Sequence, residues 1–225
     1  MARTGSTNRD LRALAEAGAP DGTAILADAQ DAGRGRLGRS FASPPGSGLY
    51  LSVLLRPALR LADLPLVALA AAVACAEVCP PGTRLKWPND LVTAEGQKLG
   101  GLLCEVDTRG GQLAWVIVGV GLNVSAVPDE LPGAACLHEL DPGVDRAELA
   151  VRVWRSLRAW VPLAARPEQV IAAWRSFALL DRPVRVAGEV GWMRDVDADG
   201  ALLFRPDGGA ERRVLAGDVE LIREG

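Results

Sequence analysis

Residues 98–123 read KLGGLLCEVDTRGGQLAWVIVGVGLN, and this stretch decides the fold. Two apolar runs, 98–107 and 112–122, flank the tight-turn sequence Arg109-Gly110-Gly111, a combination typical of a β-hairpin. Glycines stand at positions 100 and 101 near the start of the first run, and at 119 and 121 near the end of the second. We therefore predict two long paired strands whose glycines let the backbone approach a ligand.

Further elements are predicted on both sides of this hairpin. Shorter apolar runs predict strands at residues 23–29, 49–55, 84–87 and 91–92. Helices are predicted after the capping sequence Ser6-Thr7-Asn8 and over residues 64–78, 146–160 and 167–178. From about residue 181 the pattern changes to short alternating segments, 184–186, 190–196, 201–205 and 212–215, which predict a small β-barrel. The predicted domains are accordingly residues 1–178 and 179–225.

Composition excludes several classes of protein. The 225 residues are 49% hydrophobic, enough to bury a core, and the net charge of -3 argues against nonspecific nucleic-acid binding. No apolar run is expected to be long enough to cross a membrane, and the first ten residues lack a signal-peptide pattern, so we predict a cytoplasmic protein. The four cysteines show no CxxC spacing and are predicted to be buried free thiols.

Two residue types are rare enough to point to a site. Only Lys86 and Lys98 among the 25 basic residues are lysines, and the only asparagines are Asn8, Asn89 and Asn123. Arginine does not replace a compact mobile point charge, and other side chains do not copy an amide's paired donor and acceptor. These five residues are candidates, against the alternative that they cluster by chance.

The glycine-rich segment 33–48 is predicted to be a functional loop. Its start, GRGRLG, formally matches the dinucleotide-binding fingerprint, but the following Ser43-Pro44-Pro45-Gly46 cannot continue as the helix that the fingerprint needs. The loop carries Arg34, Arg36 and Arg39, whose planar guanidinium groups suit carboxylate or phosphate oxygens. A solvated loop without a ligand is the alternative.

Two lysine-bearing segments suit a polyphosphate. In Lys86-Trp87-Pro88-Asn89-Asp90 the lysine suits a phosphate, and Asn89 or Asp90 suits magnesium, although the same residues also suit a simple turn. Lys98 is suited to stabilise the charge that builds when a carboxylate attacks an α-phosphate. A solvated hairpin lysine is the alternative.

Neutral polar residues complete the candidate site. The amide of Asn123 can pair with N6 and N7 of adenine, although a turn asparagine at a strand end is common. Ser6 and Thr7 cap a helix by default, yet their hydroxyls also suit a neutral polar head such as a ureido ring.

Taken in order, the motifs resemble the biotin protein ligase family. The residues that carry the resemblance are GSTN at 5–8, ADAQDAGRGRLGR at 27–39, KWPND at 86–90, KLGG at 98–101 and GVGLN at 119–123. The resemblance implies an α+β fold, a mixed sheet with flanking helices as in class II aminoacyl-tRNA synthetases, followed by an SH3-like barrel. It implies an enzyme that uses ATP and Mg²⁺ to form biotinyl-5'-AMP and then biotinylates a lysine of a biotin carboxyl carrier domain.

The resemblance also assigns roles residue by residue. Lys98, with Arg34 and Arg36, would be catalytic. The biotin contacts would be Ser6, Thr7, Gln30, Arg34 and Gly101. The ATP contacts would be Arg36, Arg39, Phe41, Lys86, Asn89 and Asn123. Magnesium would be held by Asp90 and Asn89.

This chain departs from the family pattern in two places. Phe41 stands where the family usually has tryptophan, which predicts a smaller apolar cap over the ligand. No aromatic residue in the segment 131–137 is available to stack on adenine. The chain begins almost on the biotin motif, so we expect the ligase-only form without a DNA-binding domain, with a homodimer left open.

Two other functions compete with this interpretation. A lipoate ligase or lipoyl transferase would use the same adenylate chemistry on a different acid, but the GRGRxG loop together with KWPND favours biotin. A nonenzymatic biotin or nucleotide sensor would not need Lys98 at the reacting phosphate.

Overall fold

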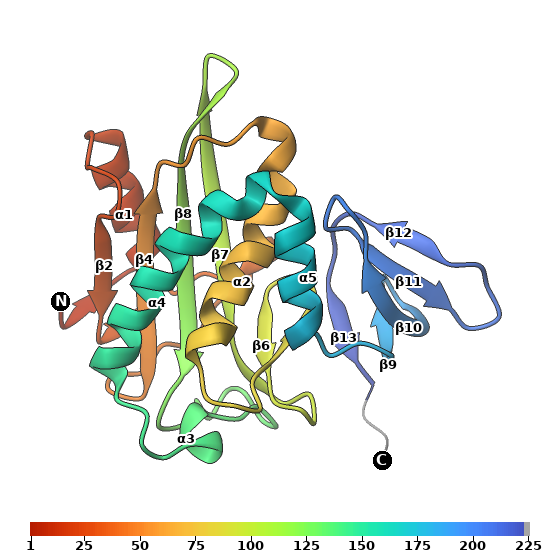
Figure 1. Cartoon of the computed structure of the whole chain (residues 1–225). Coiled ribbons are helices and arrows are strands. Elements are labelled where there is room, and N and C mark those ends of the chain that lie inside the picture. Colours follow the sequence, from red (N-terminus) through yellow and green to blue (C-terminus); the bar gives the residue numbers. More distant parts are fainter. Residues whose placement is uncertain (223–225) are drawn as a thin grey trace.

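The computed structural model describes residues 1–222, and a six-stranded sheet forms its centre (Figure 1). The strand order is β2-β4-β8-β7-β6-β5, and every neighbouring pair is antiparallel. The strands are β2 (Ala24–Ala27), β4 (Gly48–Leu55), β5 (Arg84–Lys86), β6 (Asp90–Val92), β7 (Lys98–Arg109) and β8 (Gln112–Asn123). The predicted mixed sheet is therefore corrected: the parallel pair of short strands, β1 (Arg3–Thr4) with β3 (Ala29–Gln30), lies outside this sheet.

The predicted hairpin is confirmed. Strands β7 and β8 pair over their length and turn at Gly110 and Gly111, whose positive φ angles of 58° and 75° suit glycine. The pairing sets Gly101 opposite Gly121 at the far end of the hairpin. The glycines of two separate motifs thus become neighbours.

The two faces of the sheet are covered by different helices. On β4 and β8, Val53, Leu55, Val116 and Val118 belong to the main core, which also contains α2 (Val67–Val78), α4 (Arg146–Trp160) and α5 (Pro167–Phe177). The intervening residues Leu54 and Ile117 instead pack with Leu11 of α1 (Thr7–Glu16). Since strand side chains alternate between faces, α1 covers the face opposite to α2. Figure 1 shows α2, α4 and α5 together on one side of the sheet.

The segment Leu61–Val78 corrects one expectation about membranes. It contains the 3₁₀-helix η2 (Leu61–Leu66) and α2, and by length and apolar composition it could cross a membrane, contrary to the sequence prediction. Yet 61% of the segment is buried inside the protein. Burial between the sheet and the helices α4 and α5 explains the apolar composition of α2, in which Glu77 is the one charged residue, without a membrane.

Several boundaries differ from the predictions because local contacts interrupt the periodic pattern. The strand predicted at 23–29 divides into β2 and β3, and the helix predicted at 64–78 starts with the 3₁₀ turns of η2. The elements missed by sequence are all short: β1 (Arg3–Thr4), η1 (Arg36–Gly38) inside the loop, α3 (Leu137–Leu140), η3 (Val161–Ala165) and β13 (Val219–Leu221).

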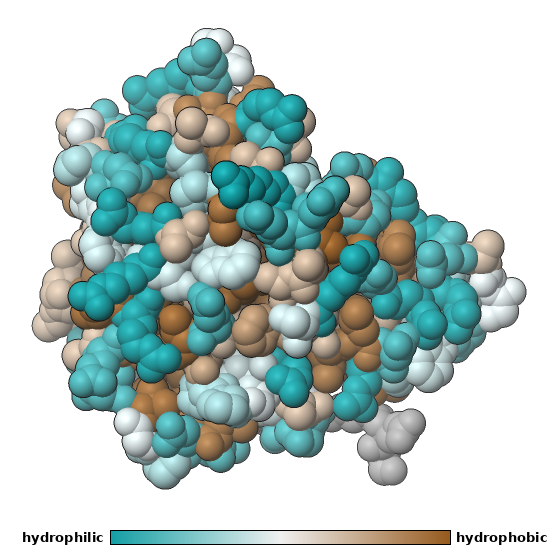
Figure 2. Space-filling view, viewed as in Figure 1, coloured by the Kyte–Doolittle hydropathy of each residue, from teal (hydrophilic) through white to brown (hydrophobic). Residues whose placement is uncertain are grey.

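A second sheet follows the helices. It contains five strands in the order β12-β11-β10-β9-β13, all antiparallel: β9 (Arg182–Val186), β10 (Glu189–Val196), β11 (Leu202–Pro206), β12 (Arg212–Val214) and β13. Within residues 1–222 no strand pairing joins β12 to β13 to close it. On the face shown in Figure 2, hydrophilic side chains cover both parts of the molecule and hydrophobic ones form small separate groups.

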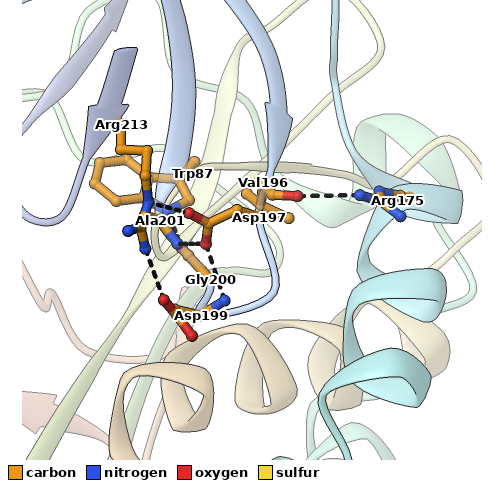
Figure 3. Close-up of polar contacts among 8 residues, drawn as sticks. All are labelled: Trp87, Arg175, Val196, Asp197, Asp199, Gly200, Ala201 and Arg213. Atoms are coloured by element: carbon orange, nitrogen blue, oxygen red, sulfur yellow. Dashed lines mark hydrogen bonds and ion pairs between the residues drawn. The ribbon is translucent and has the colours of Figure 1, made fainter.

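The tight turn at residues 197–201, between β10 and β11 of the second sheet, contacts the first part of the chain (Figure 3). Asp197 accepts hydrogen bonds from the backbone amides of Asp199 and Ala201, which fixes the turn. The indole nitrogen of Trp87 donates to the carbonyl of Gly200 at 3.0 Å. Arg175 of α5 donates to the carbonyl of Val196 at 3.1 Å. The buried Trp87 of the KWPND motif therefore anchors the C-terminal sheet.

Candidate active site

One cavity lies between the loop 33–41, the start of α1 and the glycine end of the hairpin. Of the thirteen predicted site residues, the structure brings eleven into its lining: Ser6, Thr7, Gln30, Arg34, Arg36, Arg39, Phe41, Asn89, Asp90, Lys98 and Gly101. Lys86 and Asn123 are not in this lining.

Neutral side chains connected by hydrogen bonds form one end of the cavity. The backbone amide and the hydroxyl of Thr7 both donate to Gln30 Oε1, at 2.9 and 3.0 Å. Gln30 Nε2 donates to the hydroxyl of Ser43 at 2.9 Å. The hydroxyl of Ser52 lies 2.7 Å from that of Thr7 and 2.6 Å from Asn8 Oδ1. Ser6 occupies the helix cap position, but its side chain makes no capping hydrogen bond. We call this set of side chains the neutral end; its members are Ser6, Thr7, Asn8, Gln30, Ser43 and Ser52.

Glycines form part of the cavity wall because side chains would not fit there. A Cβ atom on Gly119 would lie 2.2 Å from Asn8 Oδ1, and one on Gly121 would lie 2.5 Å from the ring of Phe41. A Cβ on Gly101 would lie 3.1 Å from Asp90 Oδ1. The glycines of the hairpin thus make room for side chains of three other segments.

Both lysines of the chain meet at one carboxylate. Lys86 Nζ lies 2.8 Å from one oxygen of Asp90, and Lys98 Nζ lies 2.8 Å from the other. Burial alone would raise the pKa of Asp90, but the charges of the two lysines and their hydrogen bonds outweigh burial and hold this pKa below its ordinary value. Asp90 is thus an ionised counter-ion for both lysines.

Two arginines of the loop, Arg36 and Arg39, are held by the turn 86–90 and by residues just before β13. Arg36 donates to Asn89 Oδ1 at 3.0 Å and to the carbonyl of Gly217 at 3.1 Å. Arg39 forms a 2.5 Å ion pair with Asp218, which also lines the cavity. Lys86 also donates to the carbonyl of Val219 at 2.8 Å. We call the region of Arg36, Arg39, Lys86, Lys98 and their acceptors the charged end.

The structure places Asn123 differently from the prediction that it reads adenine. It is buried, and its Nδ2 donates to the carbonyls of Ala135 at 3.1 Å and Lys98 at 3.5 Å. Both of its donor hydrogens are therefore used within the protein. In this arrangement Asn123 holds the segment after β8 against the start of β7.

Phe41 lies where an apolar cap was predicted. Its ring contacts the backbone of Gly121 and meets Tyr50 edge to face, with ring centroids 6.4 Å apart and planes at 73°. Burial raises the pKa of Tyr50, although a hydrogen bond from Ser47 and the charge of Arg146 partly oppose this. Phe41 therefore covers the hairpin end of the cavity.

The cavity offers no ready cage for a metal ion. No group of three or more histidine, cysteine, aspartate or glutamate side chains that could hold a metal occurs in residues 1–222. Each oxygen of Asp90 pairs with a lysine, and the Asn89 oxygen accepts from Arg36, so the predicted magnesium ligands are already engaged. As they are paired here, these residues do not form a resident magnesium site, and their assignment as magnesium ligands stays a prediction.

The cysteines are free thiols, as predicted, and are poor nucleophiles. Burial raises the pKa of Cys79 and of Cys104 to about 12. Since the thiolate is the reactive form, covalent catalysis by these cysteines is disfavoured.

Several residues of the site were missed by the sequence prediction. Asn8, flagged only as rare, lines the cavity, whereas Ser43, Ser52, Glu105 and Asp218 were not singled out at all. Asn8 was already a candidate because of its rarity, but no role in the site was assigned to it. The other four carry no sequence signal, since they become neighbours only through the fold.

Residues 1–123 of the chain match the family described as "Biotin/lipoate A/B protein ligase family". The chain is 41% identical to the "Biotin--[acetyl-CoA-carboxylase] ligase" of Mycobacterium tuberculosis, with 99% of this chain and 88% of that protein covered. It is 34% identical to the protein of the same name from Paracoccus denitrificans, with 96% of each covered. It is 30% identical to the "Bifunctional ligase/repressor BirA" of Bacillus subtilis, with 96% of this chain and 71% of that protein covered.

Solved structures resemble the fold over its whole length. The biotin protein ligase from Aquifex aeolicus in complex with biotin and ATP superposes with a TM-score of 0.78 at 31% identity, covering 100% of this chain and 97% of that one. The likeness extends across both sheets.

Proposed function

Because the chain belongs to the biotin/lipoate A/B protein ligase family, we propose that it is a biotin protein ligase. It activates biotin with ATP and transfers the biotinyl group to a lysine of a biotin carboxyl carrier domain. The names of the relatives from M. tuberculosis and P. denitrificans support biotin rather than lipoate as the acid, and acetyl-CoA carboxylase as the source of the carrier.

The reaction has two steps. In the first, a carboxylate oxygen of biotin attacks the α-phosphorus of ATP, the bond to the bridging oxygen breaks, and pyrophosphate leaves with the electron pair. In the second, a neutral lysine amine of the carrier attacks the acyl carbon, the carbon–oxygen bond to AMP breaks, and the amine loses a proton to solvent. Both steps need cations near the α-phosphate, where negative charge gathers.

One observation carries the proposal: a single cavity has a neutral end and a charged end. The neutral end presents the hydroxyl of Thr7 and the amide of Gln30, a set of donors and acceptors that suits the ureido ring of biotin. The charged end presents Arg36, Arg39 and Lys98, which suit phosphates. A ligand with a neutral head and an anionic tail fits such a site, and biotinyl-5'-AMP is of this kind.

The proposed residue roles are supported by the positions of these residues in the cavity lining. Lys98 stabilises the charge on the reacting carboxylate and α-phosphate, and Arg34 and Arg36 bind their oxygens. Ser6, Thr7, Gln30 and the backbone of Gly101 bind biotin. Arg39 and Asn89 serve the nucleotide, with Phe41 as the apolar cover.

Lys86 and Asn123 lie outside the cavity lining and act through other residues. Lys86 holds Asp90, and so keeps Lys98 in place. Asn123 fixes the backbone at Lys98 and Ala135. Magnesium enters with ATP, bound to its phosphates, and residues 1–222 contain no group of three or more acidic, histidine or cysteine side chains that could hold it by themselves.

The division of the chain after residue 178 is part of the same proposal. The support for it is that the second sheet starts at β9 and that none of its strands pairs with a strand of the six-stranded sheet, although side chains such as Lys86, Trp87 and Arg175 connect the two parts. Five short antiparallel strands are consistent with an open SH3-like barrel, and the helix-covered sheet with the class II synthetase-like architecture.

Mass spectrometry of a purified carrier domain tests the function. The carrier is incubated with this protein and magnesium ATP, with biotin in one reaction and lipoate in a parallel one. We expect a mass gain of one biotinyl group that requires ATP. A mass gain with lipoate alone would indicate a lipoate ligase or lipoyl transferase instead. No gain with either acid would favour a nonenzymatic biotin or nucleotide sensor.

A further inference from the structure

Glu105 of β7 connects the loop to helix α1. Its side chain is only 12% exposed and receives three donors from two other segments. Asn8 Nδ2 donates to Oε2 at 2.9 Å, Arg12 Nη2 donates to Oε1 at 2.6 Å, and Arg34 Nη1 lies 3.5 Å from the same Oε1. A carboxylate that sequence motifs did not mark therefore joins the biotin motif to the arginine-rich loop.

The two arginines hold Glu105 unequally. Arg12 makes a short hydrogen-bonded ion pair, whereas Arg34 makes only a longer ion pair and is 53% exposed. Arg34 also lines the cavity. If Arg34 turned toward a ligand, Glu105 would keep Arg12 and Asn8 as partners, and its charge would stay compensated.

We propose that Glu105 is a positioning residue that holds Arg34 beside the cavity and releases it to the carboxylate of the acid substrate, while Arg12 neutralises Glu105 in its place. The inference rests on the proposed function, because that function supplies an anionic carboxylate at this position. It adds two residues, Glu105 and Arg12, that act on the acid substrate only through Arg34.

The exchange predicts different effects on biotin binding when either partner of the Arg12–Glu105 ion pair is replaced. With Arg12→Leu, Arg34 becomes the only cation beside a nearly buried carboxylate. When Arg34 then turns to an anionic ligand, Glu105 is left charged without a cationic partner, which disfavours binding. With Glu105→Gln, nothing competes for Arg34, and the new amide oxygen can still accept from Asn8. Loss of Arg12 therefore weakens binding of the acid, whereas loss of the Glu105 charge does not.

Calorimetric titration with biotin and with its neutral amide, biotinamide, separates this exchange from a structural effect. We expect Arg12→Leu to weaken biotin binding about tenfold and to leave biotinamide binding unchanged. Glu105→Gln should bind biotin as tightly as the unmodified protein or more tightly. The double variant should recover biotin binding to within about threefold of the unmodified protein.

Arg9→Leu is the matched control, since Arg9 is on the same helix, is 62% exposed and pairs only loosely with Asp10 at 3.7 Å. It should leave both titrations unchanged. Equal weakening of biotin and biotinamide by Arg12→Leu, or weaker biotin binding by Glu105→Gln, would overturn the exchange. If Arg12→Leu does not fold, the biotin affinity of Glu105→Gln alone decides, and weaker binding than that of the unmodified protein overturns the exchange.

The proposed function is tested separately in the same samples. Pyrophosphate release by the unmodified protein with biotin and ATP, without a carrier, reports adenylate formation. If this release is absent, the proposed function fails. If it is present, and Glu105→Gln weakens biotin binding or Arg12→Leu weakens biotin and biotinamide equally, only the exchange fails.

Discussion

The neutral end and the charged end of the cavity hold their polar groups in different ways. At the neutral end, Thr7, Gln30 and Ser43 satisfy one another through hydrogen bonds of 2.9–3.0 Å without any formal charge. At the charged end, each cation pairs with an acceptor of the protein: Lys98 forms an ion pair with Asp90, and Arg39 forms one with Asp218. The neutral end is organised by donors and acceptors, and the charged end by counter-ions.

This difference has a consequence for ligand binding. A neutral head can join the hydrogen bonds of Thr7 and Gln30 with little change in charge. A phosphate must instead share or replace Asp218 or Asp90 as the partner of a cation. We therefore expect substitutions at the charged end to change reaction rate, stability or the KM for ATP, and substitutions at the neutral end to change affinity for the acid.

The largest effect is expected from Lys98→Ala. Removal of the cation beside the α-phosphate should slow adenylate formation by about 10²–10³-fold, because that charge acts mainly on the transition state. Biotin binding should stay nearly unchanged. Pyrophosphate release and calorimetric titration measure the two quantities, and an unchanged rate of release would remove Lys98 from catalysis.

The next effect is on stability. Asp90→Asn leaves two lysines without their shared counter-ion, and we expect the free energy of unfolding at neutral pH to fall by about 2 kcal/mol, less than for a fully buried pair because Lys98 is partly exposed.

The pH dependence of this effect has a definite sign. Because the folded-state pKa of Asp90 is lowered, its contribution is full above the ordinary value of 3.8 and is lost as pH falls below it. Urea unfolding of both proteins between neutral pH and pH 3 should therefore show a difference that shrinks only at the acid end. A difference that grows toward acid pH would contradict this account.

A smaller effect is expected at the neutral end. Thr7→Val keeps the shape but removes the hydroxyl between Gln30 and Ser52, and we expect the KM for biotin to rise about tenfold with kcat nearly unchanged. Steady-state kinetics of adenylate formation measure both constants. Thr23→Val, at a hydroxyl that bonds only to the Pro20 carbonyl, is the matched control. A fall in kcat alone would erase the distinction between the two ends.

The smallest effect is expected for Asp218→Asn. Its ion pair with Arg39 is between two partly exposed side chains, and such pairs contribute little. Because Asp218 competes with phosphate for Arg39, we expect the KM for ATP to fall about twofold to threefold. A rise in this KM would mean that Asp218 positions Arg39 rather than competing for it.

The long elements were predictable because their patterns are strong. The hairpin at residues 98–123 and the helix at 146–160 lie where apolar pattern and turn chemistry placed them. The short strand β13 was missed because three residues carry too little pattern. The direction of pairing in the main sheet was also wrong, since pairing joins segments far apart in the chain.

The sequence by itself determined the motifs, their order and the chemistry of Thr7, Gln30, Arg36 and Lys98, because residue type fixes charge and hydrogen-bonding capacity. Only the tertiary structure decided which groups they meet. The carbonyl of Val219 accepts a hydrogen bond from Lys86, and Glu105 forms ion pairs with Arg12 and Arg34. These contacts join segments that are distant in sequence. Counter-ions are set by proximity in space, which no local pattern encodes, so the pairing of Asp90 with both lysines and the hydrogen bonds of Asn123 to Ala135 and Lys98 were not predicted.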